Sequence, residues 1–347
     1  MKTNIKYSNQ QLTPNGTTVD LKLALSCDVH HDADSLLGNR FLCRGSGGLL
    51  VGQSGIGKST CAFQMACHWA VGKDFFGICP TSKEPMKVLL VQSENDALEI
   101  AEVLQSVTEN WDPAEVELLL SHLMVANVWN KQGAEFGAWL REATTKFNPD
   151  LVIVDPLMGF LGADVLSNEA ITTFMREYIN NALKNPPAGC RQFGMIFVHH
   201  TGKPSGNGRK GEKPTSATRM YDMLGASELV NWARCIMRLD SAIERGRAVF
   251  LIPKRGDRSG VPFLGAEEEW GCFLRHAAPN PNSQKRVMCW ESAGASLVPP
   301  VVVLPSQPEV AVEVTKAKGA GRRTKPSSPK DADDCNSAGP LRPSASE

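Results

Sequence analysis

Residues 52–59 constrain the fold of this chain more than any other segment. They read Gly-Gln-Ser-Gly-Ile-Gly-Lys-Ser and satisfy the phosphate-loop pattern G-x-x-x-x-G-K-S/T in full. The apolar run GGLLVG precedes the loop, and STCAFQMACHWAVG follows it with apolar side chains at helical spacing. The sequence therefore predicts a buried strand, a glycine-rich loop and a helix in that order, which is the context that supports the pattern.

This loop indicates binding of nucleotide phosphates. Its glycines allow backbone N–H groups to turn toward the phosphates, and the following helix adds the positive end of its dipole. We expect Lys58 to reach the β- and γ-phosphates, and Ser59 to offer its hydroxyl to a Mg²⁺ ion that bridges them. The expected ligands are ATP and Mg²⁺. The residues predicted to bind the nucleotide are Gly52, Gln53, Ser54, Gly55, Ile56, Gly57, Lys58, Ser59 and Thr60.

Apolar segments alternate with helical patterns along the chain. Further strands are expected at residues 87–92, 122–128, 151–155, 195–200, 235–240 and 248–255, and helices at about 96–107, 135–147 and 168–183. The run LVIVD at 151–155 is typical of a strand buried on both faces. These features predict an α/β fold with a central, mostly parallel sheet flanked by helices. Such sheets bind ligands at the carboxyl ends of their strands.

The composition divides the chain into three parts. Residues 1–36 are polar and predict an N-terminal arm, in which the presence of a helix stays open. Residues 37–296 are expected to form the nucleotide-binding domain. Residues 297–347 are rich in proline, serine and basic residues, which predicts a mostly disordered tail.

The overall charge balance does not decide which class of partner the protein binds. The 37 basic and 37 acidic residues neither support nor exclude a nucleic-acid partner. No apolar run approaches the roughly 20 residues that a membrane span needs, and the first residues lack the apolar core of a signal peptide. We therefore expect a cytoplasmic protein with no membrane partner.

Metal or disulfide sites are not favoured. The ten cysteines include no C-x-x-C pair, so we interpret most of them as small buried hydrophobic residues. His30, His31, Asp32 and Asp34 could form a metal cluster, but no second group of ligands at fixed spacing accompanies them. A solvated N-terminal loop is the preferred interpretation.

Two carboxylates follow predicted strands. Asp155 closes the strand at 151–155 and is expected to help hold Mg²⁺; the alternative is a turn that ends the strand before Pro156. No glutamate follows Asp155, so the base that activates water must come from another strand. Glu94 follows the strand at 87–92 and is the candidate, although residues 93–96 could instead cap the next helix.

Two further features stand after the strand at 195–200. His199 and His200 end it and could sense the γ-phosphate, or serve only structure. The next segment, residues 201–216, is rich in glycine and basic residues. This suits contact with a nucleic-acid backbone, although such loops are also commonly just solvated. The candidate DNA-binding residues are Lys203, Arg209, Lys210 and Lys213.

The chain resembles the RepA branch of the RecA and DnaB-like ATPases, a branch that includes the hexameric replicative helicase of broad-host-range plasmids. The similar segments, between about residues 37 and 260, are STCAFQMACHWAVG, VLLVQSEN, LVIVDPL, FVHHTGK and LGASELVNWARCIMRL. The resemblance implies a RecA-like AAA family ATPase that assembles as a homo-oligomeric ring, a hexamer, with ATP bound between subunits. It would make Glu94 the catalytic base and His199 or His200 the sensor.

The same resemblance implies an arginine finger, a basic residue supplied by the adjacent subunit. The candidates are Arg234, Lys254, Arg255 and Arg258, and the sequence does not choose among them. The N-terminal arm and the C-terminal tail depart from the family, so loading partners and any specialised role are not carried over.

The leading hypothesis is an ATP-driven protein that moves along or unwinds single-stranded DNA. One alternative is a P-loop kinase or KaiC-like regulatory ATPase, which would transfer phosphate to a side chain or a small acceptor. Another is a nucleotide-controlled binding platform, in which ATP orders loops and sets assembly.

Overall fold

The computed structural model describes residues 21–26, 28, 32–201, 227–242, 247–265, 269–278 and 287–294. The helices are α1 (Leu21–Leu25), α2 (Lys58–Ala70), α3 (Ala97–Thr108), α4 (Pro113–His122), α5 (Gly133–Phe147), α6 (Leu157–Leu161), α7 (Asn168–Thr173), α8 (Asn180–Lys184) and α10 (Ser227–Trp232), with a π-helix Phe174–Ile179 and a 3-10 helix Gly256–Arg258. The strands are β1 (Ser35–Leu37), β2 (Leu42–Cys43), β3 (Gly47–Gly52), β4 (Val88–Gln92), β5 (Leu123–Asn127), β6 (Leu151–Asp155), β7 (Gly194–His200), β8 (Cys235–Ser241), β9 (Arg247–Lys254), β10 (Phe263–Leu264), β11 (Glu269–His276) and β12 (Trp290–Ser292).

The central sheet is mostly parallel, which confirms the predicted fold class. Its strand order is β10-β11-β9-β8-β3-β7-β6-β4-β5, and β12 pairs with β11. The strands from β8 to β5 in this order run parallel to their neighbours, whereas β9 to β12 extend the sheet with antiparallel pairs. The phosphate-loop strand β3 is therefore central, with its carboxyl end beside that of β7.

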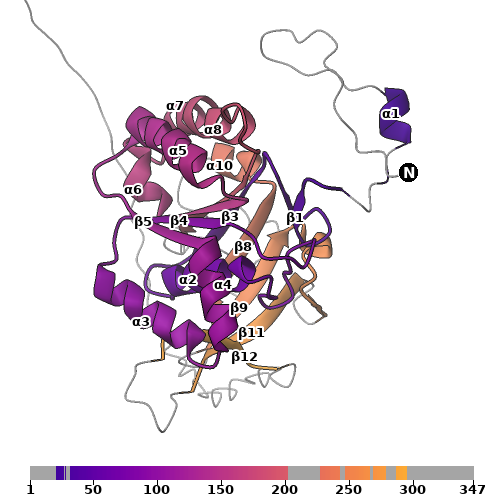
Figure 1. The fold of residues 1–347 in the computed structure, drawn as a ribbon, viewed down its shortest axis with the longest axis vertical. Coiled ribbons are helices and arrows are strands. Elements are labelled where there is room, and N and C mark those ends of the chain that lie inside the picture. The colour runs from indigo at the N-terminus through magenta and orange to yellow at the C-terminus, as the bar shows by residue number, and fades with distance from the viewer. Residues whose placement is uncertain are drawn as a thin grey trace, which may run out of the picture. The chain divides into compact units, whose positions relative to one another are not determined.

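Helices cover both faces of the parallel strands, because these strands are apolar throughout. Every residue of β3, β4 and β6 is buried. Alternate side chains enter opposite cores: Leu50 packs in the core that includes α2, and Leu49 in the core that includes α5. Figure 1 shows α2, α3 and α4 on one side of these strands and α5, α7, α8 and α10 on the other.

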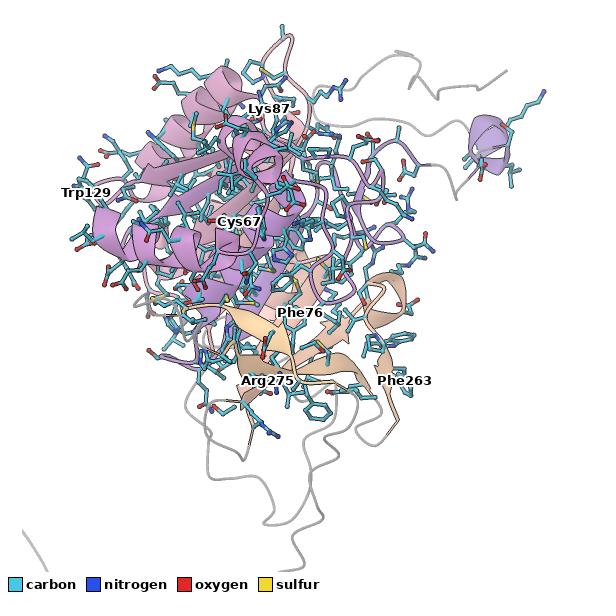
Figure 2. The ribbon with its side chains drawn as sticks, turned by 60° about the horizontal axis from the view of Figure 1, so that its bottom comes forward. Cys67, Phe76, Lys87, Trp129, Phe263 and Arg275 are labelled. Atoms are coloured by element: carbon cyan, nitrogen blue, oxygen red, sulfur yellow. The ribbon has the colours of Figure 1, made fainter. Side chains whose placement is uncertain are left out.

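Side-chain exposure follows this layering. Cys67 of α2 is fully buried inside the packed core, whereas Trp129, just after β5, is 75% exposed at the periphery (Figure 2). Of the cysteines that the structure describes, all are free thiols. Within the described ranges, no helix has the length and apolar character required to cross a membrane.

The expected elements up to residue 255 are present, with one correction. The helix expected at 168–183 is not one regular α-helix, because the π-helix Phe174–Ile179 separates α7 from α8. Helix α1 shows that the arm contains a short helix. The tail expected at residues 297–347 lies outside the described residues.

Several elements were not expected from the sequence. Helix α4 begins at a capping box in which Asp112 and Glu115 bond each other's backbone amides, a local signal that could have revealed it. Strands β1, β2, β10 and β12 are only two or three residues long. Such short strands carry too little alternation to be recognised, and pairing with partners distant in sequence defines them.

Candidate nucleotide-binding site

The phosphate loop joins β3 to α2 and depends on glycine at two positions. Gly57, which precedes α2, has φ +94°, a left-handed conformation that L side chains rarely adopt. At Gly52, a Cβ would lie 2.5 Å from the carbonyl oxygen of Leu239. The loop therefore passes closer to β8 than any larger residue would allow, and it opens at the N-terminus of α2, where a dipole favours anions.

Lys58 lies inside this loop. Its side-chain ammonium donates to the carbonyl oxygen of Gln53 at 2.7 Å and lies 3.1 Å from Nδ1 of His200. Burial lowers the pKa of Lys58 to about 8, while the charges of Asp155 and Glu94 act in the opposite direction. The ammonium is thus confined at the loop among carboxylates, where it can exchange a carbonyl partner for phosphate oxygens.

Asp155 lies beside Ser59, although 96 positions separate them in the sequence. The carboxyl group accepts a hydrogen bond from the Ser59 hydroxyl, and only 4% of Asp155 is exposed. Burial raises the pKa of Asp155 to about 6; the Ser59 hydrogen bond and Lys58 lower it, and Glu94 adds to the rise. A carboxylate beside a hydroxyl at the phosphate loop is an oxygen donor set that suits Mg²⁺.

Glu94 is exposed in a turn that Gln92 holds in place. The side chain of Gln92 accepts from the amide of Asn95 at 2.8 Å and donates to its carbonyl oxygen at 2.9 Å. The cap of α3 is Asp96, whose side chain accepts from two backbone amides of the first turn. Glu94 itself does not serve as the cap, and its charge acts on Lys58, Asp155 and His200.

The two histidines at the end of β7 have different surroundings. His199 is fully buried, whereas His200 is partly exposed and lies against Lys58. Burial lowers the pKa of His200, Lys58 lowers it further, and Glu94 opposes the shift. Successive side chains of a strand point to opposite faces, so only one of the pair can face the phosphate loop, and it is His200.

Thr201 is a site residue that the sequence did not single out. Its amide donates to the carbonyl oxygen of Gly52 at 3.0 Å and so ties the residue after β7 to the start of the phosphate loop. Its hydroxyl is buried without a hydrogen-bond partner among the described residues. Buried hydroxyls are normally satisfied, so this one is available to an oxygen of a bound ligand or its water.

The candidate finger residues lie at the edge of the sheet formed by the amino ends of the parallel strands, opposite the phosphate loop. The amide of Arg234 donates to the carbonyl oxygen of Gly47, the first residue of β3, at 2.7 Å. Lys254 ends β9 opposite Ile236, close to the start of β8. Strand β3 has six residues, so about 20 Å separates this edge from the phosphate loop of the same chain.

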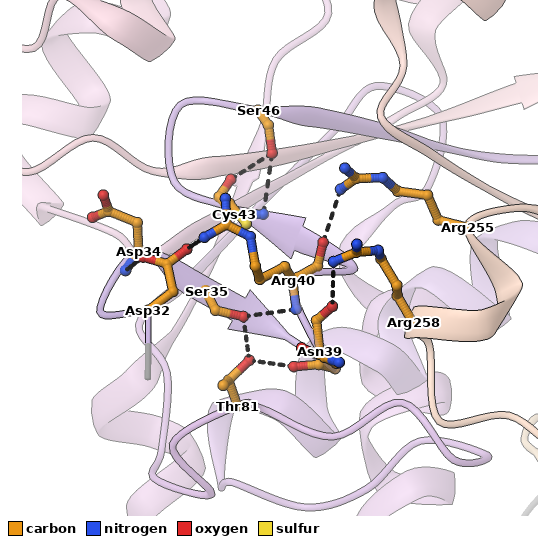
Figure 3. A network of polar contacts seen from close by, with 11 residues as sticks. Asp32, Asp34, Ser35, Asn39, Arg40, Cys43, Ser46, Thr81, Arg255 and Arg258 are labelled. Carbon is orange, nitrogen blue, oxygen red and sulfur yellow. Dashed lines mark hydrogen bonds and ion pairs between the residues drawn. The ribbon is translucent and has the colours of Figure 1, made fainter. Parts of the chain in front are cut away.

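Three of the four candidates are held by backbone carbonyls, and Arg234 is the exception. Lys254 donates to Val230 at 2.8 Å and to Ala233 at 2.5 Å. Arg255 and Arg258 reach the carbonyl oxygens of Arg40 and Asn39 (Figure 3), at 2.8 and 3.4 Å. The guanidinium of Arg234 is exposed and has no hydrogen bond or ion pair within the described ranges.

Other expectations fall on parts that the structure does not describe. The candidate DNA-binding residues Lys203, Arg209, Lys210 and Lys213 lie outside the described residues, as do His30 and His31. Asp32 forms an ion pair with Arg40. In the described part of the chain, no three residues of the His, Cys, Asp and Glu types gather as a metal site.

Comparison with known proteins gives one family match. A family model described as "AAA domain" matches residues 28–206, just over half of the 347-residue chain. Among solved structures, the crystal structure of the RadB recombinase is similar, with a TM-score of 0.43, 16% sequence identity and coverage of 68% of this chain and 89% of that chain. No curated protein matches the sequence.

Proposed function

The chain belongs to the AAA domain family, as a RecA-like P-loop ATPase, and we propose that it hydrolyses MgATP in a ring of identical subunits and couples hydrolysis to movement on single-stranded DNA. One observation carries the ATP-hydrolysis part of the proposal: Lys58, the Ser59–Asp155 pair and Glu94 converge although β3, β6 and β4 supply them from distant parts of the chain. Each side chain stands at the carboxyl end of a parallel strand, where such sheets bind ligands.

The proposed roles follow from these positions. Lys58 and the loop amides bind the phosphates, and Ser59 and Asp155 hold the metal. Bound Mg²⁺ would offset the negative charge that develops on the terminal phosphate. Glu94, exposed at the end of a turn fixed by Gln92, accepts the proton of the attacking water.

His200 is the proposed sensor. It touches Lys58 and directly precedes Thr201, whose amide bonds Gly52. If Lys58 changes position when the γ-phosphate leaves, His200 and the adjacent Thr201 would transmit the change along the chain. The segment that begins at residue 202 carries the candidate DNA-binding residues. Loss of His200 should weaken the response to DNA more than basal hydrolysis.

In the proposed assembly, a neighbouring subunit supplies the arginine finger. The basic edge with Arg234 lies about 20 Å from the phosphate loop of its own chain, so it can act only on the loop of another copy. A head-to-tail interface that joins these two edges forms a ring when its rotation closes, which is the assembly we propose. Arg234 is the proposed finger because its guanidinium is exposed, whereas Lys254, Arg255 and Arg258 bond backbone carbonyls.

ATP hydrolysis with and without single-stranded DNA tests the proposal. Wild type should turn over ATP, single-stranded DNA should accelerate it at low salt, and Lys58→Ala should be inactive in both conditions. Lys87→Ala is the matched control, because Lys87 contacts Phe147 away from the loop. If single-stranded DNA does not change the rate of ATP hydrolysis, the proposal of ATP-driven movement on DNA is wrong. If the protein assembles in response to ATP but does not hydrolyse it, the alternative of a nucleotide-controlled binding platform is favoured.

A further inference from the structure

The last described strand, β12, places Trp290 against the phosphate loop. The indole Nε1 lies 3.4 Å from the carbonyl oxygen of Gly57, and a Cβ added to Gly57 would lie 2.9 Å from the indole Cζ2. Only 3% of Trp290 is exposed. The indole therefore covers the residue at which the loop turns into α2.

A side chain of α2 holds the backbone of Trp290 in place. The side chain of Gln64 accepts from the Trp290 amide at 2.8 Å and donates to the Trp290 carbonyl oxygen at 2.8 Å. Gln64 thus satisfies both backbone groups of Trp290, which lies opposite His276 in the pairing of β12 with β11. On the next helix, the Ser106 hydroxyl accepts from the amide of Met288 at 2.7 Å. On β11, His276 stacks on the indole with ring centroids 4.0 Å apart.

We propose that Trp290 is a positioning residue for nucleotide binding: its indole holds Gly57 in the left-handed conformation in which the loop amides face the phosphates. The proposal rests on the proposed function of the loop. A glycine at φ +94° has many other conformations open to it, and the indole removes those that need the space it occupies. The strand that leads into the C-terminal tail thereby preorganises the phosphate loop.

Trp290→Leu tests this role, with Trp270→Leu as the matched control. Trp270 lies on the adjacent strand β11 and packs against Gly256 and Phe263, away from the phosphate loop. Two readouts are measured: the affinity for ADP by titration calorimetry, and hydrogen exchange at the Cys61 amide without nucleotide. That amide donates to the Gly57 carbonyl oxygen at 2.9 Å and reports opening of the first turn of α2.

Trp290→Leu should bind ADP about tenfold more weakly than wild type and exchange faster at Cys61, whereas Trp270→Leu should match wild type in both. Trp290→Phe, which keeps a ring beside Gly57, should recover most of the affinity. If the leucine variant does not fold, Trp290→Met, which also lacks a ring, takes its place with the same expected losses. Equal affinity and exchange in wild type and in the folded leucine or methionine variant would overturn the positioning role. No ADP binding by wild type would instead overturn the proposed function.

Discussion

At the scale of single residues, the proposed phosphate and metal ligands differ in exposure from the proposed base. Lys58, Ser59 and Asp155 are buried or partly buried at the loop, whereas Glu94 is exposed at the end of its turn. Groups that hold phosphate and metal benefit from fixed surroundings. The proposed base must also meet a water molecule, so exposure suits it.

Glu94→Gln should bind ATP as wild type does but hydrolyse it at least about a hundredfold more slowly, because the amide cannot accept the proton of water. Binding and single-turnover hydrolysis measure the two steps separately. Glu102→Gln is the control, since Glu102 is exposed on α3, the helix that follows the Glu94 turn. Substantial turnover by Glu94→Gln would show that another group is the base.

The pKa of Asp155, raised to about 6 by burial, predicts how metal binding depends on pH. The carboxyl group becomes neutral as pH falls through about 6, so the gain in ADP affinity on adding Mg²⁺ should shrink between roughly pH 7 and pH 5. Asp155→Asn has no proton to gain there and corrects for titration of the nucleotide itself. The idea fails if both proteins show the same pH profile.

At the scale of elements, side chains that bond the backbone hold the turns at the strand ends in place. Gln92, buried at the end of β4, forms both hydrogen bonds of the Glu94 turn through its amide group. Its neighbour Asp96 caps α3 with Glu99 in a capping box. The turn is therefore held at both ends, and Glu94 projects from a rigid support.

Gln92→Ala should lower turnover roughly ten- to a hundredfold while ADP affinity stays near wild type, because it removes the two hydrogen bonds that hold the Glu94 turn. Steady-state kinetics and ADP titration give the two quantities. Gln132→Ala is the control: this exposed glutamine donates to Gly159 at 3.3 Å on a neighbouring part of the same edge. Equal loss of affinity and turnover would mean that Gln92 supports the whole site.

At the scale of the whole molecule, the sheet separates the candidate nucleotide-binding site from the candidate finger residues. The carboxyl edge carries the phosphate loop, and the amino edge carries the basic cluster of Arg234, Lys254, Arg255 and Arg258. Arg234 and Arg258 both lower the pKa of Arg255, after burial, so these cations lie close enough to repel one another. An anion from another copy would relieve that repulsion.

Mixing two inactive variants tests this arrangement. Arg234→Ala should bind ATP but hydrolyse it slowly, as should Glu94→Gln, because each lacks one half of a shared site. In a random one-to-one mixture, about a quarter of the interfaces would combine an intact Glu94 with an intact Arg234, and activity should return in that proportion. Mixed assemblies that stay inactive would exclude Arg234 as the finger and direct the test to Arg258.

The sequence by itself determined the phosphate loop, the order of the main strands and helices, and the α/β class. These follow from local patterns: glycine spacing, runs of apolar residues and helical periodicity act within a few residues of one another. The capping box of α4 belongs to the same local chemistry.

Only the tertiary structure decided which strand ends meet, which histidine faces Lys58, which edge holds the basic residues, and that Trp290 covers Gly57. The Trp290–Gly57 contact joins residues 233 positions apart. Contacts of this kind depend on strand order and register across the sheet, and a local pattern is compatible with many such arrangements. Packing of the two cores selects one of them.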